Sequence, residues 1–208
     1  MCGQFELRVK ARGLSKCLPK LHLNQQQMPR GPEMNPRDPV LMLLADADAY
    51  SAATARWGLA GSFLTHDPQI PVINLRGEGL ADMPFYGKIF RRKRCLVPAT
   101  AFFAREAMAR GERQKLRFSH PDGELLLFAA VFDHHPVAGT SCALVTRDVG
   151  ERRMPVILGR DAAAFWLTDF PEFPVAEFDE ILFGELPTLL CERVIEPEAS
   201  PQLAFKFA

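Results

Sequence analysis

The N-terminus carries the residue types with the most distinctive chemistry. The chain begins Met1-Cys2-Gly3, and methionine aminopeptidases remove Met1 when a small residue follows it. The mature chain then starts with a 1,2-aminothiol, whose amine and thiol have ordinary pKa values of about 7.7–8.0 and about 8.5. The thiol could attack an acyl carbon with the amine as its base, or both groups together could capture an aldehyde as an imine and then as a thiazolidine ring. In the simplest alternative, Cys2 is only a small residue at the end of a strand.

The cysteines as a set do not form a disulfide or metal pattern. They are odd in number and widely spaced, without a C-x-x-C pair, at positions 2, 17, 95, 142 and 191. This distribution argues against a disulfide framework and against a structural zinc site. We therefore expect a protein of the reducing cytoplasm, with no metal and no organic cofactor.

Charge is segregated along a chain whose formal net charge is zero. Residues 88–117 contain ten Lys and Arg against two Glu, a net charge of +8, whereas residues 169–198 contain nine acidic residues against one Arg, a net charge of −8. A basic central segment could follow a phosphate backbone, although such segregation also occurs in proteins that never meet nucleic acid.

The length of 208 residues predicts one domain spanning residues 1–208. The apolar run at residues 125–131 is far shorter than the roughly 20 residues that a membrane span needs. The N-terminus also lacks the basic and apolar regions of a secretory signal. We expect neither a membrane protein nor an exported one, and the sequence gives no indication of oligomeric state.

The elements that must position these residues are predicted to be mostly strands. Strands are expected at residues 5–9 and 142–146, and residues 40–45 form an apolar run. Residues 95–98 and 101–103 are expected to be buried extended chain that Pro98 interrupts. The turn at 120–123 is expected to join 116–119 and 124–132 in a hairpin. Residues 24–39 are predicted to form a long irregular loop, and Asp161 to cap a short helix over 161–167. Irregular strand spacing excludes repeated βαβ units and favours the α+β class.

Several sequence blocks have the order and spacing of a known family. They are Met1-Cys2-Gly3 with Phe5, Trp57-Gly58-Leu59, Asn74-Leu75-Arg76-Gly77-Glu78, Arg94-Cys95-Leu96-Val97-Pro98-Ala99 with Phe102-Phe103, and Arg153-Met154-Pro155-Val156-Ile157-Leu158. Together they resemble the SRAP family, named from "SOS response-associated peptidase", with its N-A-R-x-E, RCLIPA-x-GFYEW and H-x-RMPVIL motifs. The resemblance extends from the N-terminus to about Trp166.

The resemblance implies a fold and an activity. The fold is a curved, mostly antiparallel β-sheet approaching a barrel, flanked by a few helices, with the N-terminal cysteine at the floor of a positively charged cleft. In the family the ring-opened sugar of an abasic site presents an aldehyde, which Cys2 captures as a thiazolidine DNA–protein crosslink that shields the lesion. The expected partner is single-stranded DNA with abasic sites, because the sugar must reach the pocket unpaired. Autoproteolytic removal of Met1 accounts for the peptidase label.

Individual site residues follow from the matched motifs. Asn74 matches an asparagine whose amide can bind the captured sugar or the terminal amine, and Arg76 and Arg153 match phosphate-contacting or site-flanking arginines. Pro36 resembles the proline of a loop that wedges against DNA, and Phe63 occupies the place of a second tryptophan. Each has a structural alternative: the asparagine could cap a turn, the arginines could form surface ion pairs, and Phe63 could belong to the core.

The chain departs from the family motifs at the positions of the acid–base groups. Ala104 stands where the family has its glutamate, Arg105 where it has a tryptophan, Glu151 where it has a histidine, and Gln4 where it has an arginine. Loss of a positioned acid–base group typically costs about 10²–10⁴-fold in rate. Glu106 lies on the same face of an extended strand as the missing glutamate and could replace it, or could simply pair with a surface arginine.

These departures leave three hypotheses open. In the first, capture through Cys2 survives, although slowly, because it needs only the aminothiol. Glu106 could supply the missing acid, as could Glu151 if burial raised its pKa from about 4.3. The second hypothesis is a relative that binds single-stranded or damaged DNA, or a protein partner, without crosslinking. The third is a peptidase or amidase with an N-terminal nucleophile that acts on something other than DNA. The four catalytic candidates are thus Cys2, Asn74, Glu106 and Glu151.

Overall fold

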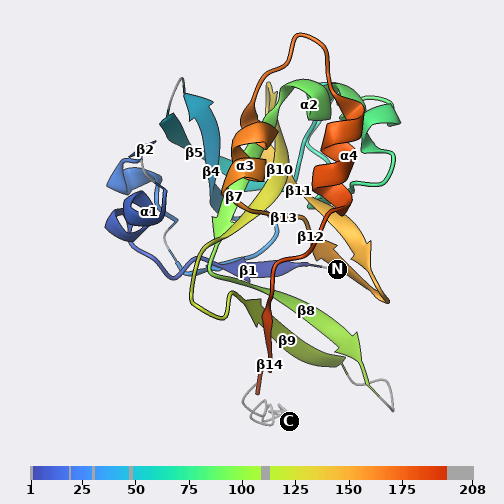
Figure 1. The fold of residues 1–208 in the computed structure, drawn as a ribbon. Coiled ribbons are helices and arrows are strands. Elements are labelled where there is room, and N and C mark those ends of the chain that lie inside the picture. Colours follow the sequence, from blue (N-terminus) through green and yellow to red (C-terminus); the bar gives the residue numbers. More distant parts are fainter. Residues whose placement is uncertain (1, 19, 30, 47–48, 109–112, 196–208) are drawn as a thin grey trace, which may run out of the picture.

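A closed ring of strands forms the centre of the computed structural model, which describes residues 2–18, 20–29, 31–46, 49–108 and 113–195 (Figure 1). The ring consists of β4 (Pro39–Asp46), β5 (Ala49–Trp57), β11 (Gly139–Val149), β10 (Leu126–His135) and β7 (Arg94–Ala99). Adjacent strands pair antiparallel except where β11 meets β5, whose parallel pairing at Cys142 and Trp57 closes the ring. The predicted sheet approaching a barrel, with few helices, is confirmed.

Short strands extend the ring on several sides. β2 (Leu21–His22) pairs with β5, β6 (Asn74–Arg76) and β12 (Arg152–Pro155) pair with β11, and β13 (Ile157–Leu158) pairs with β10. The helices are α1 (Ala11–Cys17), α2 (Tyr86–Arg92), α3 (Arg160–Leu167) and α4 (Val175–Phe183), with 3₁₀ turns η1 (Gln25–Gln27) and η2 (Leu80–Asp82). None of the helices in the described ranges is long and apolar enough to cross a membrane.

A second, antiparallel sheet packs below the ring in Figure 1. Its strand order is β14 (Leu190–Arg193), β9 (Arg113–Ser119), β8 (Ala101–Ala107), β1 (Gln4–Glu6) and β3 (Glu33–Met34). The core lies between this sheet and the ring, because the Phe5 ring packs edge-on against Trp57 at 4.9 Å and against Phe128 at 5.9 Å. Since side chains alternate along a strand, burial of Phe5 turns Gln4 and Glu6 to the opposite face of β1.

The predicted hairpin at residues 116–132 is wrong in its pairing, although both strands exist. β9 pairs with β8 and β14, whereas β10 pairs with β7 and β11, so the turn at 120–123 carries the chain from one sheet to the other. The Phe118 ring stacks on Phe102 of β8 at 5.0 Å. Burial of that aromatic pair against the core, rather than the turn chemistry, selects the partner strand.

Three smaller predictions also need correction. Pro98 lies inside β7 opposite Leu127, and the chain leaves that strand at Thr100 instead. Asp161 lies within the first turn of α3, whose N-cap is Gly159. The segment predicted as an irregular loop over 24–39 contains η1 and the short strand β3, which pairs with β1.

Candidate functional site

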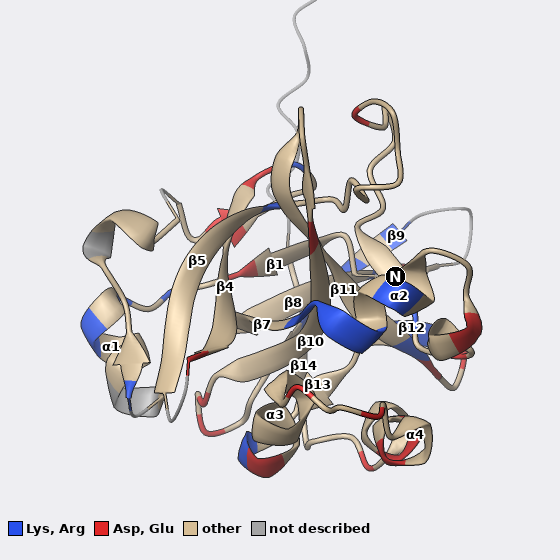
Figure 2. Ribbon diagram, turned by 90° about the horizontal axis from the view of Figure 1, so that it is seen from above, with Lys and Arg blue, Asp and Glu red and all other residues tan. Residues whose placement is uncertain are grey.

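Cys2 lies two residues before β1, the strand that both ribbon views label (Figures 1 and 2). Its side chain is fully buried, and its thiol donates a hydrogen bond to the Gln4 carbonyl at 3.6 Å. Burial raises the pKa of the Cys2 thiol to about 12. At neutral pH this thiol is therefore protonated, which disfavours direct attack by a thiolate.

Asn74 reaches Cys2 from the start of β6. The parallel pairing of β6 with β11 sets Asn74 opposite Leu144, and its Nδ2 donates a hydrogen bond to the Cys2 carbonyl at 2.7 Å. Its Oδ1 is buried without a hydrogen-bond partner among the described residues. An unpaired buried acceptor costs about 1–3 kcal/mol, and this one suits a donor such as an amine or a sugar hydroxyl.

Arg76 lies two residues further along β6, on the same face of the strand as Asn74. Its side chain is exposed. Within the part of the chain that the structure describes, it forms no hydrogen bond or ion pair. A guanidinium in this position can bind a phosphate beside the site without first breaking an internal contact.

Arg153 of β12 occupies a contrasting, buried environment. Its Nε donates to Thr146 Oγ1 at 3.0 Å, and its Nη1 pairs with Asp148 Oδ1 at 2.6 Å. Its Nη2 pairs with Glu78. Partial burial is the largest single influence on the pKa of Glu78 and would raise it. The hydrogen bond and charge of Arg153, together with backbone hydrogen bonds from Glu78 and Asp148, nevertheless lower that pKa below its ordinary value. Arg153 therefore links β12 to β11 and to the segment after β6, and these acidic partners occupy its donors.

The two carboxylate candidates, Glu106 and Glu151, are partly or fully exposed. Ala104, at the place of the family's glutamate, is buried on β8 opposite Leu116. Glu106 forms an ion pair with Arg152 of β12, with side chains 37 % and 42 % exposed respectively. Glu151 is exposed in the turn between β11 and β12, so the burial on which its role as an acid depended is not found.

Pro36 and Phe63 lie in adjoining loops. Pro36 is exposed in the turn between β3 and β4, and Arg37 beside it donates to the Gln69 carbonyl at 2.6 Å. The Phe63 ring is half-buried and stacks on Phe85 at 4.7 Å. The interpretation of Phe63 as a packing residue thus agrees with its contacts, although the side chain remains partly exposed.

The loop that carries Phe63 is held by buried polar groups of β10. The Ser62 amide donates to Asp133 Oδ2 at 2.6 Å, and His135 Nε2 donates to the Leu64 carbonyl at 3.1 Å. Asp133 is fully buried and also pairs with Lys93. Sequence reasoning missed these positioning residues, because nothing in their local spacing indicates what they contact.

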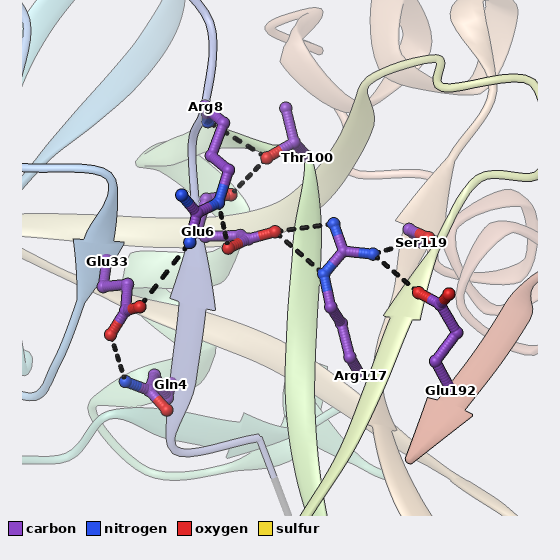
Figure 3. Close-up of polar contacts among 8 residues, drawn as sticks. All are labelled: Gln4, Glu6, Arg8, Glu33, Thr100, Arg117, Ser119 and Glu192. Carbon is purple, nitrogen blue, oxygen red and sulfur yellow. Dashed lines mark hydrogen bonds and ion pairs between the residues drawn. The ribbon is translucent and has the colours of Figure 1, made fainter. Parts of the chain in front are cut away.

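β1 is anchored by a buried carboxylate on its outer face (Figure 3). Glu6 Oε1 accepts hydrogen bonds from Arg117 Nη2 at 2.6 Å and Nε at 2.9 Å, and Glu6 Oε2 accepts one from Arg8 Nε at 2.6 Å. Arg117 also pairs with Glu192 of β14 at 3.1 Å. This network fixes the strand that leads directly from Cys2 into the core.

Two cavities accompany the site and the barrel. One of about 370 Å³ lies beside the N-terminus and is lined by Gly3, Gln4, Asn35, Phe103, Ala104, Arg105, Arg113 and Lys115. A more apolar cavity of about 420 Å³ lies against the start of β10 and the segment 185–187. Among the described residues, no group of three or more His, Cys, Asp or Glu side chains could hold a metal ion.

Comparisons with known proteins find relatives of this chain. The sequence model of a family described as SOS response associated peptidase (SRAP) matches residues 1–188. Two similar proteins come from Bacillus subtilis (strain 168). "Abasic site processing protein YoaM" is 26 % identical to this chain over 184 residues, which cover 80 % of this chain and 79 % of that protein. "Abasic site processing protein YobE" is 27 % identical over 184 residues, which cover 80 % of this chain and 82 % of that protein.

Solved structures share the fold. A protein from Bacteroides thetaiotaomicron superimposes with a TM-score of 0.79 at 17 % identity, covering 93 % of this chain and 92 % of the other. A phage-related protein from Bordetella bronchiseptica superimposes with a TM-score of 0.73 at 24 % identity, covering 94 % and 95 %.

Proposed function

Because the chain belongs to the SOS response associated peptidase (SRAP) family, we propose that it processes abasic sites in DNA by binding single-stranded DNA and capturing the sugar aldehyde through Cys2. The observation that carries the proposal is the Asn74 side chain, which holds the Cys2 carbonyl through Nδ2 while its buried Oδ1 lacks a partner among the described residues. Once Met1 is removed, the new Cys2 amine is one hydrogen-bond donor that this oxygen can accept.

The reaction needs only groups that the chain and the lesion supply. Hydrolysis of the Met1–Cys2 peptide bond consumes one water and frees the amine. The amine nitrogen adds to the aldehyde carbon, and loss of one water gives the imine. The Cys2 sulfur then adds to the imine carbon while the thiol proton passes to nitrogen, which closes the thiazolidine. The raised pKa of the thiol suits this order, because the amine attacks first and the sulfur brings its own proton.

The residues proposed to bind DNA around this centre are those whose side chains are at least partly exposed. Arg76 is exposed two residues from Asn74 and is proposed to contact a phosphate next to the abasic sugar. Pro36 and Phe63 are proposed to contact flanking bases, since apolar and aromatic side chains stack on unpaired bases. For Arg153 we propose an indirect role, because Glu78 and Asp148 neutralise it.

Proton transfer is expected to be slow. Ala104 supplies no acid, and Glu106 is held by Arg152, so Glu106 can serve only when that exposed ion pair opens. Glu151 is exposed in the turn between β11 and β12 and lacks the buried environment that its proposed role requires. These observations favour, as a second candidate function, a protein that binds single-stranded DNA without a stable crosslink. The protonated Cys2 thiol disfavours the third hypothesis of a thiolate peptidase.

The test is the intact mass of the purified protein before and after incubation with a single-stranded oligonucleotide that carries one abasic site. We expect loss of Met1, and an adduct equal to the oligonucleotide mass less one water that is absent from Cys2→Ala. A processed N-terminus with no adduct after long incubation would overturn capture and favour the binding-only function. An adduct that persists in Cys2→Ala would show that another nucleophile reacts.

A further inference from the structure

Phe85, the residue before α2, has a backbone conformation that aromatic residues rarely adopt. Its φ is +64° and its ψ is −58°, and the Tyr86 amide donates a hydrogen bond to the Pro84 carbonyl at 2.7 Å. These values define a γ-turn of the positive-φ type centred on Phe85, which is a rare and strained turn. Backbone strain of this kind persists only where the surrounding structure imposes it, and it is concentrated at ligand-binding and catalytic sites.

The packing of α2 against η2 imposes this turn. A Cβ at Gly87 would collide with the Ala81 carbonyl oxygen, so the two helical segments are in close contact at this point. The Gly87 amide donates to the Met83 carbonyl at 2.9 Å, and Arg91 Nη2 donates to the Ala81 carbonyl at 3.3 Å. With both segments fixed, residues 83–85 must reverse the chain within a short distance.

The strained turn places the Phe85 ring on the Phe63 ring. The ring centres lie 4.7 Å apart with an interplanar angle of 25°, and Tyr86 packs edge-on against Phe63 at 5.5 Å. The Phe63 ring lies over Gly61, where a Cβ would collide with it. Phe63 is therefore the inner ring of the stack, whereas Phe85 is 54 % exposed and forms the outer ring. Because Phe63 covers one face of the outer ring, the other face is the one available to a ligand.

One buried carboxylate holds the two segments that carry these rings. Asp133 accepts a hydrogen bond from the Ser62 amide at 2.6 Å and pairs with Lys93, the C-cap residue of α2. The same two segments precede and follow β6, the strand of Asn74 and Arg76. The stacked rings are thus held in place next to the segments that enter and leave the strand of the candidate site.

The charges near the stack are cationic. Residues 83–93 contain no acidic residue. Lys88 and Arg92 lie four residues apart on one side of α2, whose Lys and Arg are blue in Figure 2, and both are exposed. Within the described part of the chain, neither forms a hydrogen bond or an ion pair. Exposed aromatic rings beside cations are typical of sites for single-stranded nucleic acid, in which the rings stack on bases and the cations attract the backbone.

We propose that the outer face of the Phe85 ring stacks on an unpaired base of the bound strand, supported from behind by Phe63. The identity of the polymer rests on the proposed function, whereas the ligand class, a planar group on an anionic chain, rests on the ring stack and its cations. Phe85 lies outside all the sequence blocks that resemble the family. Stacking tolerates any base, so the contact is expected to depend on the presence of a base and not on its identity.

The experiment compares two single-stranded oligomers of equal length by fluorescence anisotropy. One is oligothymidylate, and the other carries tetrahydrofuran in place of every nucleoside, so that it has the phosphates without the bases. For Phe85→Ala we expect a roughly fivefold higher Kd for oligothymidylate and an unchanged Kd for the base-free oligomer. Phe85→Tyr keeps a ring and should keep the original Kd for both. Phe183→Ala, which removes a 45 % exposed phenylalanine from α4, is the matched control and should change neither Kd.

A further variant, Phe85→Gly, tests whether the strained turn exists in solution. Glycine adopts positive φ without strain, so Phe85→Gly should bind oligothymidylate as weakly as Phe85→Ala but unfold at a higher temperature. Thermal unfolding also verifies that each variant retains its fold. A lower unfolding temperature for Phe85→Gly than for Phe85→Ala would contradict the strained turn on which the position of the ring depends.

The outcomes separate this inference from the proposed capture, because neither oligomer contains an aldehyde. A loss of affinity in Phe85→Ala that is confined to oligothymidylate supports stacking even if an abasic oligonucleotide gives no adduct. Unchanged affinity for oligothymidylate, or equal losses for both oligomers, would overturn stacking even if Cys2 forms the adduct. Failure of the unsubstituted protein to bind oligothymidylate would also overturn it.

Discussion

The Asn74 side-chain amide and the Cys2 carbonyl, 72 positions apart in the sequence, lie 2.7 Å from each other. The contact depends on two independent pairings, of β6 with β11 and of β1 with β8. It brings a bifunctional amide to the backbone of the residue whose amine is proposed to react. The amide's donor holds the Cys2 carbonyl, and we propose that its buried acceptor binds the amine or the sugar.

For Asn74→Ala we expect the maximal rate of adduct formation to fall about tenfold, because one orienting hydrogen bond and one acceptor are removed. Arg76→Gln should instead raise the DNA concentration needed for half-maximal rate and leave the maximal rate nearly unchanged. Single-turnover kinetics over a range of oligonucleotide concentrations separate the two effects. Equal losses of maximal rate in both variants would contradict the assignment of Asn74 to chemistry and Arg76 to binding.

The sequence motifs name Cys2 and Asn74, which the structure brings into contact, but they do not predict the strand partners. The partner of β9 cannot be predicted from its turn, because the stacking of Phe118 on Phe102 depends on a distant strand. Local sequence determines where a strand occurs, whereas pairing depends on which aromatic faces become buried together.

The charge pattern is informative only in part. Composition predicts that the segment at 88–117 could follow phosphates, but burial of Arg94 and the pairing of Arg117 with Glu6 remove two of its cations from such a role. The composition gives the number of charged residues but does not show which residues they pair with in the fold. The position of Glu106 beside Arg152, 46 residues away in the sequence, cannot be predicted for the same reason.

Glu106→Gln tests whether this carboxylate supplies the missing acid. If it does, the rate of adduct formation should fall at least tenfold, since a general acid is worth about 10²–10⁴-fold. The exposed ion pair with Arg152 should contribute no more than about 1 kcal/mol to stability. Urea unfolding measures the second quantity and adduct kinetics the first. An unchanged adduct rate in Glu106→Gln would remove Glu106 from the mechanism.

Removal of Glu6 is expected to destabilise the protein strongly. Glu6→Ala leaves Arg117 and Arg8 without the buried carboxylate that accepts their hydrogen bonds. Because both arginines are partly exposed, the loss of these charged hydrogen bonds should cost about 1.5–3 kcal/mol. Glu33→Ala is the matched control, because its carboxylate is about half exposed and lies 3.6 Å from Arg8. It should cost less than about 1 kcal/mol. Equal unfolding free energies for the two variants would contradict an anchoring role for Glu6.

Buried thiols predict a loss of stability at alkaline pH. Burial raises the pKa of both Cys2 and Cys142 from 9.0 to about 12. The folded state therefore keeps a proton on each thiol that the unfolded chain releases above pH 9, so this stability is fully present below pH 9 and is lost as pH rises toward 12. Each such thiol should lower the free energy of unfolding by about 1.4 kcal/mol per pH unit in that range.

Cys142→Ala isolates one of these groups without touching the N-terminus. Because alanine has no ionisable thiol, the variant should lose stability less steeply than the unsubstituted protein between pH 9 and the pKa of about 12. Its lower stability at neutral pH would reflect only the smaller side chain. Urea titrations at pH 7, 9 and 10.5 measure both effects. Parallel pH dependences for the two proteins would mean that Cys142 is not a buried, protonated thiol in solution.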